Sequence, residues 1–403
     1  MPIRKEIPVE QLRIGMYVAE LDRPWLDSKF PFQGFPITSD ADLSRLRQTC
    51  RSVFIDLEKG IAPGGAPAAA APAPGAVPSQ GAVRYPERVP VERELTHARG
   101  LYEECKRALQ KNIQTLTAGG ELDAKSMKTT VDKISESIER NPDAMLLLTK
   151  VRQKDEKQLE RALDVSVLMV SFARFLQLPR EQLDLLGLVG LLQDIGKVKI
   201  PDAILNKREA LTAEEQQRAR LHVVHSAAMV RATQGLPPGI ADLLLLHHER
   251  YDGSGYPRGL AGNDIGMVGW IAAIADSFSA MTRARPYAEQ MSPSNALGIL
   301  YKSRGTAYHE ALVEQFIQCI GIYPVGSVVQ LNSGEIGVVI AQNRVRRLQP
   351  RVMVLLDAQS KPITPQKILD LIKEPTSPSG EPYRIRRTLE SDKLPLDPHD
   401  FFL

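Results

Sequence analysis

The sequence predicts a mainly α-helical protein that carries a small β-rich unit toward each end of the chain. Three observations lead to this fold class. Residues 91–322 place their apolar side chains at helical spacing. Residues 1–60 and 323–375 instead contain short runs in which apolar and polar residues alternate. Residues 61–90, between the first β-rich unit and the helical part, are rich in Ala, Pro and Gly, a composition that cannot bury a core.

The first β-rich unit contains two runs with the period of a strand. GMYVAEL (15–21) and SVFIDLE (52–58) alternate apolar and polar residues. A short helix is expected between them at 40–49. The following linker is most biased over 61–82, which we expect to be a flexible, extended tether.

The helical part divides into a connector, 91–148, and a larger domain, 149–322. One amphipathic stripe of the connector consists of Met127, Val131, Ile134 and Ile138. In the larger domain, Thr212 and Glu215 have capping-box spacing, which predicts a helix that runs toward Gln234.

The second β-rich unit, 323–375, follows Tyr323-Pro324. Short strands are predicted at 326–331, 334–343 and 350–357. The remaining residues, 376–403, are rich in Pro and charge and are expected to be irregular.

Composition excludes some functions and favours a compartment. The formal net charge of +3 gives no argument for DNA binding by bulk charge. The cysteines Cys50, Cys105 and Cys319 lie far apart, which favours reduced thiols. No signal-peptide h-region and no run of about 18 apolar residues is present, so we expect a cytoplasmic protein without a membrane span.

Polar residues occur on three predicted helices that are otherwise apolar on nearly all faces. LDLLGLVGLLQDIGK ends near Asp194, ADLLLLHHER ends with His247 and His248, and GWIAAIADSFSAMT contains Asp276. Such helices are buried, so these side chains should converge inside the bundle. Since a buried carboxylate needs a cation, the set predicts a metal site, with His222 as a further candidate ligand.

Simpler interpretations stay open for each residue. Asp194 and Lys197 could form only an ion pair. Adjacent histidines at a helix end often interact with the helix dipole. His225 lies one turn from His222, so periodicity does not choose between them.

The stretch HHERYDGSGYPRGLAG (247–262), together with QDIGK and ADSFSAMTRARPY, closely resembles the HD-GYP domain, a bacterial branch of the HD phosphohydrolases. The resemblance covers about 150–320. The first sixty residues, with GMYV, LDRPWLDSKF, QGF and VFID, resemble the small N-terminal domain of unknown function that precedes some HD-GYP domains.

This resemblance implies an all-helical HD-type bundle that hydrolyses cyclic di-GMP to linear pGpG or to GMP. In the family, a metal-bound hydroxide attacks the phosphorus, and two or three divalent transition metals, often iron or manganese, are bound. It also implies cytoplasmic bacterial signalling, with other signalling proteins such as diguanylate cyclase domains as candidate partners. Formation of a homo-oligomer stays open.

Carried over residue by residue, the family's motif predicts a degenerate metal site. The four ligands of one metal correspond to Asp194, His222, His247 and His248. The neighbouring metal would use Asp276 and two histidines, but Arg161 and Gln193 stand at those two positions. Gln binds transition metals poorly and Arg carries the wrong charge, so we expect one ion rather than two or three.

Other matching positions imply roles in catalysis and ligand binding. Asp194 and Lys197 are the expected catalytic residues, and Arg161 or Lys197 could stand near the phosphate in place of a metal. The expected ligand contacts are Tyr256, Gly255, Pro257 and Arg285, although glycines and Pro257 would also suit any tight loop.

Three functions follow as alternatives. The first is a cyclic di-GMP phosphodiesterase whose degenerate site makes it weak or silent. The second is a catalytically inactive module that binds cyclic di-GMP or a partner, and the third is a structural adaptor with an empty site.

Overall fold

A computed structural model describes most of the chain. The described residues are 4–22, 35–37, 40–56, 83, 85–150, 160–283, 291–343 and 346–389. The chain divides into two compact units, Met1–Pro78 and Ser79–Leu403. The predicted tether at 61–82 lies outside the described residues.

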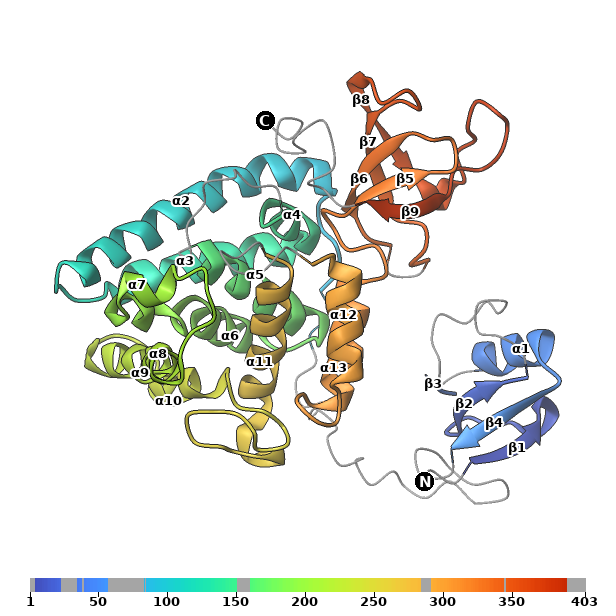
Figure 1. The fold of residues 1–403 in the computed structure, drawn as a ribbon. Helices are drawn as coiled ribbons and strands as arrows, with labels where there is room; N and C mark the ends of the chain where they lie inside the picture. The colour runs from blue at the N-terminus through green and yellow to red at the C-terminus, as the bar shows by residue number, and fades with distance from the viewer. Residues whose placement is uncertain are drawn as a thin grey trace. The chain divides into compact units, whose positions relative to one another are not determined.

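The first unit is a small antiparallel sheet with one α-helix (Figure 1). The strand order is β1-β4-β2-β3. Its elements are β1 (Arg4–Pro8), η1 (Val9–Gln11), β2 (Tyr17–Leu21), β3 (Phe35–Pro36), α1 (Asp40–Thr49) and β4 (Ser52–Asp56). The predicted helix at 40–49 and the strands within 15–21 and 52–58 are therefore confirmed, and β1 and β3 were not predicted.

The larger unit begins with a helical bundle (Figure 1). Its α-helices are α2 (Val91–Thr117), α3 (Ala124–Arg140), α4 (Pro142–Leu148), α5 (Glu160–Phe175), α6 (Arg180–Leu192), α7 (Asp202–Leu205), α8 (Ala213–Arg220), α9 (His222–Ala232), α10 (Ile240–Leu243), α11 (Gly266–Met281), α12 (Pro293–Lys302) and α13 (Glu310–Ile320). Short 3-10 helices are η3 (Ile195–Lys199), η4 (Leu244–Leu246) and η5 (Gly262–Ile265).

The close packing of α5 on α6 forms the centre of this bundle and positions the end of α6. A Cβ atom on Gly190 would lie 2.8 Å from the Cα atom of Ser166, so only glycine allows the two helices to approach this closely. Ser166 also donates a 2.9 Å hydrogen bond from its hydroxyl to the Gly187 carbonyl oxygen. Helix α11 packs on α5, so these three helices present their side chains to a common interior.

Two further helix predictions have different outcomes. The stripe predicted in the connector is confirmed, because all four of its residues are buried in α3. The capping box of Thr212 and Glu215 is also present. The helix that it opens ends at Arg220, and a second helix, α9, begins at His222, so the single long helix expected there is wrong.

The chain then forms a five-stranded antiparallel sheet with the order β8-β7-β6-β5-β9. Its strands are β5 (Val328–Leu331), β6 (Ile336–Ala341), β7 (Arg351–Leu356), β8 (Pro362–Asp370) and β9 (Ile385–Leu389), with η6 (Leu371–Lys373) after β8. The three predicted strands are confirmed, and β8 was not predicted.

Strand β9 corrects the prediction that 376–403 is irregular. This strand pairs with β5, and Tyr383 just before it is buried in the core of the sheet. Arg386 and Arg387 are exposed in this strand. An edge strand can carry such charges because these side chains remain in solvent while the backbone pairs with β5. The prediction failed because composition was weighed above the apolar Ile385 and Leu389 at the two ends of the strand.

The sheet contacts the helical bundle through polar pairs. The backbone N–H of Gln342 donates to the Asp143 carboxylate at 2.9 Å, and Arg351 forms an ion pair with Glu92. Glu92 belongs to α2 and Asp143 to α4, so the first and the last helix of the connector both contact the sheet.

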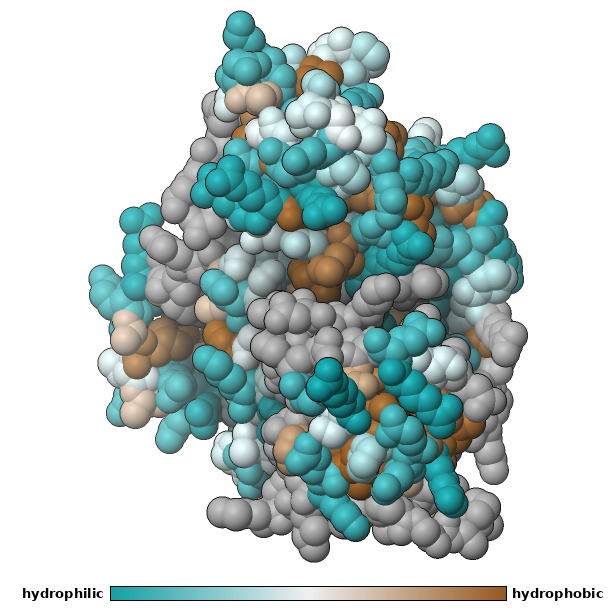
Figure 2. Space-filling model, turned by 90° about the vertical axis from the view of Figure 1, so that its right-hand side faces the viewer, coloured by the Kyte–Doolittle hydropathy of each residue, from teal (hydrophilic) through white to brown (hydrophobic). Residues whose placement is uncertain are grey.

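The surface carries mainly polar side chains on the face drawn in Figure 2, where apolar residues gather only in small groups. Large apolar side chains with substantial exposure are scattered over several elements, for example Ile14, Leu221, Val224 and Leu348. Among the helices that the structure describes, none is both long and apolar enough to span a bilayer.

Candidate metal centre

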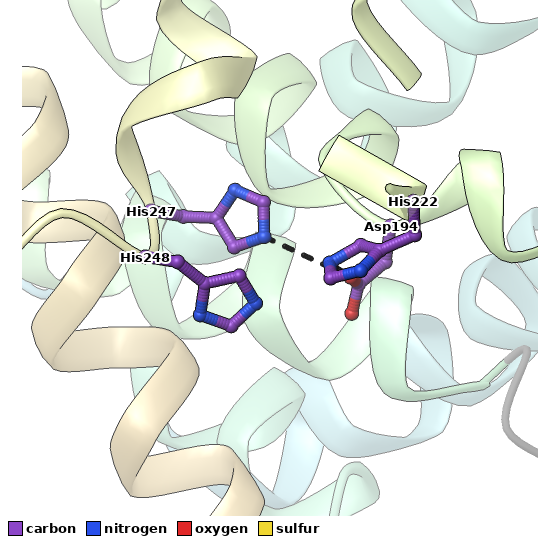
Figure 3. Close-up of side chains that lie close together, drawn as sticks. All are labelled: Asp194, His222, His247 and His248. Carbon is purple, nitrogen blue, oxygen red and sulfur yellow. Dashed lines mark ion pairs between the residues drawn. The ribbon is translucent and has the colours of Figure 1, made fainter. Parts of the chain in front are cut away.

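Four side chains from three segments of the bundle converge in one place (Figure 3). Asp194 follows the end of α6, His222 is the first residue of α9, and His247 and His248 follow η4. One candidate ligand atom from each side chain lies within 4.8 Å of all the others. The convergence predicted for these four residues is therefore observed.

A tight contact between the turn after α6 and helix α9 sets the position of Asp194. A Cβ atom on Gly196 would lie 2.2 Å from the His222 carbonyl oxygen, so no larger residue fits there. The Gly196 N–H donates to the Ser226 hydroxyl at 2.8 Å, and this hydroxyl donates to the Gln193 carbonyl oxygen at 2.7 Å. Ser226 thus fastens both ends of the turn that carries Asp194.

Backbone carbonyl groups orient the two most buried imidazoles. The Nδ1 atom of His222 lies 2.7 Å from the Ala219 carbonyl oxygen, and that of His247 lies 2.8 Å from the Leu244 carbonyl oxygen. A carbonyl oxygen can only accept, so each Nδ1 carries the proton and each Nε2 presents a lone pair. Burial lowers the pKa of His247 to about 4, which keeps this ring neutral.

The lone pairs point toward a carboxylate oxygen that has no donor. The Nε2 atoms of His222 and His247 lie 3.2 Å and 3.8 Å from Oδ1 of Asp194. Within the described part of the chain, none of these three buried atoms has a hydrogen-bond partner. Since buried polar atoms rarely stay unsatisfied, this donor set fits a divalent transition metal.

The other oxygen of Asp194 forms the predicted ion pair. Lys197 Nζ lies 2.7 Å from Asp194 Oδ2, and Arg161 Nη1 lies 3.9 Å from the same oxygen. Burial alone would raise the pKa of Asp194, but the positive charges of Lys197 and Arg161 hold it well below its usual value. The ion pair and a metal do not compete, because they would use different oxygens of one ionised carboxylate.

A second cluster beside these ligands contains Arg161, Gln193 and Asp276. Arg161 Nη2 lies 2.7 Å from Asp276 Oδ1, and the Gln193 amide donates to the same oxygen at 3.1 Å. Asp276 is almost fully buried and is not one of the four convergent residues. Its carboxylate therefore faces Arg161 and Gln193, the two residues that the family resemblance places at the histidine positions of the neighbouring metal.

The loop that contains Tyr256 is held close to His248. The two rings stack with centroids 4.6 Å apart and an interplanar angle of 23°. A Cβ atom on Gly255 would lie 2.4 Å from the backbone nitrogen of Arg250, which gives this glycine a structural reason. Pro257 is exposed in the same loop, and Arg285 lies outside the described residues.

Sequence reasoning missed Glu249, which organises this loop. Its buried carboxylate accepts hydrogen bonds from the backbone N–H groups of Arg258 at 2.8 Å and Leu260 at 3.0 Å. Its place directly after two histidines at the end of an apolar helix was the available signal. Of the two histidines between which periodicity did not choose, His222 lies in the convergent group, as the family resemblance implies, whereas His225 is half-exposed and lies outside it.

Comparison with known proteins identifies three matching families. An HD domain matches residues 143–312, a domain of unknown function, DUF3391, matches 4–127, and a KOW domain associated with HD domains matches 328–377. The HD match includes all four convergent residues.

Several curated relatives are named cyclic di-GMP phosphodiesterases. The one from Pseudomonas aeruginosa is 38% identical over 371 residues, which cover 91% of this chain and 89% of the relative. A response regulator from Xanthomonas campestris is 36% identical over 161 residues, covering 40% of this chain and 42% of the relative. A solved HDGYP protein from Bdellovibrio bacteriovorus is 15% identical, with a TM-score of 0.47 over 78% of this chain and 98% of that one.

Proposed function

The chain belongs to the HD-GYP family, and from this premise we propose that it binds cyclic di-GMP at a degenerate, single-metal site and hydrolyses it weakly or not at all. The relative that matches along most of the chain is named for the same nucleotide. The proposed setting is the bacterial cytoplasm, as the family implies.

The contact of Arg161 with Asp276 carries this proposal. Gln193 and Arg161 both donate to Asp276 Oδ1, so the oxygen that would help to bind a second ion already has two donors. The guanidinium is a fixed positive charge 3.9 Å from Asp194, and it would repel a second cation. This arrangement supports one ion, iron or manganese, with Asp194, His222, His247 and His248 as its ligands.

The proposed roles of the remaining residues follow from their charges. The metal, when bound, would supply a Lewis acid that polarises a phosphoryl oxygen and acidifies water. Lys197 fixes the orientation of Asp194, and Arg161 offers hydrogen bonds to a phosphate oxygen. Tyr256 and its loop, with Arg285, would contact the rest of the nucleotide.

Weak hydrolysis follows from what a guanidinium cannot do. Arginine can hold a phosphate, but it keeps its proton at any ordinary pH and does not generate a nucleophile from water. The same contact supports the alternative of an inactive module that binds cyclic di-GMP and passes its state to partners such as diguanylate cyclase domains.

Metal content and turnover together test the proposal. The full chain would be purified anaerobically, washed with chelator, and assayed for metals and for cyclic di-GMP binding and cleavage with manganese or ferrous iron. We expect about one retained ion per chain, measurable binding and slow or absent cleavage. Two or more retained ions, or a metal-loaded protein that does not bind cyclic di-GMP, would contradict the proposal. Binding of cyclic di-GMP without any cleavage would favour the alternative of a catalytically inactive binding module.

A further inference from the structure

Arg220 lies over the ring that stacks on the candidate metal ligands. It is the last residue of α8, two positions before His222. Its guanidinium carbon lies 4.7 Å from the centroid of the Tyr256 ring, and Tyr256 in turn stacks on His248. A chain of three planar groups therefore leads from a candidate ligand to the surface.

The N–H groups of Arg220 are available to a ligand. The side chain is exposed, and no acceptor or carboxylate partner for it exists within the described ranges of the chain. Glu215, on the same helix, is already paired, because Lys207 lies 2.6 Å from its carboxylate and the same carboxylate accepts from the backbone at the N-terminus of α8. The cation–π contact with Tyr256 thus holds Arg220 in place without consuming its donors.

We propose that Arg220 recognises the guanine base of the bound cyclic dinucleotide and that Tyr256 positions the Arg220 side chain. This inference rests on the proposed function. A phosphate bound at Asp194 and the histidines is separated from its base by only one sugar. The base would therefore reach the edge of the site, where Arg220 lies two stacking layers from His248.

The chemistry of the base edges favours guanine over adenine. Guanine presents two acceptors, O6 and N7, to which a guanidinium can donate two parallel hydrogen bonds. Adenine presents an amino group at the position of O6, which would face the donors of Arg220. Arg220 should therefore contribute specificity as well as affinity.

Calorimetric titration of the manganese-loaded full chain with cyclic di-GMP and with cyclic di-AMP tests this inference. Arg220→Ala should weaken cyclic di-GMP binding by about tenfold or more and reduce the preference for guanine over adenine by a similar factor. Arg218→Ala is the matched control, because Arg218 is exposed on the same helix and carries the same charge. Tyr256→Phe should keep the preference and Tyr256→Ala should lose it, with metal content unchanged in every variant.

Each other outcome has a distinct meaning. An equal loss for both nucleotides in Arg220→Ala would overturn guanine recognition and indicate a phosphate contact. Unchanged binding of both would show that Arg220 only covers Tyr256, and would leave the proposed function intact. Failure of the wild-type chain to bind either nucleotide would overturn the proposed function itself.

Discussion

Two adjacent clusters in the same bundle meet the same electrostatic demand by different means. Around Asp276, a carboxylate oxygen receives two donors, from Arg161 and from Gln193. Around Asp194, the Oδ1 atom receives none, and the Nε2 atoms of His222 and His247 face it without hydrogen-bond partners in the described part of the chain. A buried carboxylate needs positive charge nearby, and the chain supplies it to Oδ1 of Asp276 through Arg161 and to Oδ2 of Asp194 through Lys197, while Oδ1 of Asp194 has no donor.

We call Arg161, Gln193 and Asp276 the filled cluster, because the carboxylate oxygen there already has donors. We call Asp194, His222, His247 and His248 the receptive cluster, because Oδ1 of Asp194 has none. Lone pairs that converge without donors can bind a metal, whereas Oδ1 of Asp276 already accepts from Arg161 and Gln193 and has less coordination left to offer. The two clusters also interact, because the guanidinium of Arg161 lies near both carboxylates. We therefore propose that the charge of Arg161 limits how many cations the cluster around Asp194 can accept.

The largest expected effect is the loss of metal from the receptive cluster. His222→Ala removes one of four ligands and leaves Asp194 Oδ1 with fewer partners, so metal retained after a chelator wash should fall from about one ion per chain to almost none. His225→Ala is the control, because His225 lies on the same helix outside the cluster. Equal metal content in the two variants would contradict the assignment of His222 as a metal ligand in this cluster.

The next effect is a gain from rebuilding the filled cluster. Arg161→His with Gln193→His removes the guanidinium and places two imidazoles beside Asp276, so a second ion should bind. Two-metal clamping of a phosphate should then raise cyclic di-GMP cleavage by roughly a hundredfold. Each single variant should gain much less. If wild type already cleaves as fast as the double variant, Arg161 would have to be a working phosphate ligand.

Sequence reasoning identified the receptive cluster because burial and polarity conflicted visibly. Asp194, His247 and His248 end helices that are apolar on nearly all faces, so their side chains had to point into the bundle. Periodicity could not choose between His222 and His225, because both lie on one helix, and the choice of His222 came from the family resemblance. In the structure, the close packing of Gly196 on the start of α9 accompanies a His222 that faces Asp194.

The filled cluster and Arg220 could not be derived in the same way. Arg161 and Asp276 are 115 residues apart, and their pairing depends on how α11 packs on α5, which no local pattern specifies. Arg220 and Arg218 look alike in the sequence, and only the contact with Tyr256 distinguishes them. Strand β9 was missed because its sequence is rich in charge. Charged residues are common both in irregular tails and in edge strands, so composition did not distinguish the two.

A smaller effect should appear in stability. Asp276→Asn keeps the shape of the side chain but leaves the partly buried Arg161 without its carboxylate partner at 2.7 Å. We expect the free energy of unfolding to fall by about 3 kcal/mol, measured by urea denaturation of metal-free protein. Asp242→Asn, which breaks exposed pairs with Arg231 and Arg258, should cost less than about 1 kcal/mol. Similar losses in both variants would mean that the Asp276 pair is no more than a surface contact.

The smallest effect should come from Arg161→Lys, which keeps the charge and changes its shape. The guanidinium donates to Asp276 while another of its nitrogens faces Asp194, a geometry that a single ammonium group cannot reproduce. Losing one charge-assisted contact while keeping the other should lower the free energy of unfolding by about 1 kcal/mol. Since the cation remains beside both carboxylates, the metal content should stay at about one ion per chain. Uptake of a second ion by this variant would show that the shape of the guanidinium and its hydrogen bond to Asp276, rather than the positive charge, exclude the metal. The filled cluster would then owe its character to coordination geometry, and Gln193 would become the residue to change first.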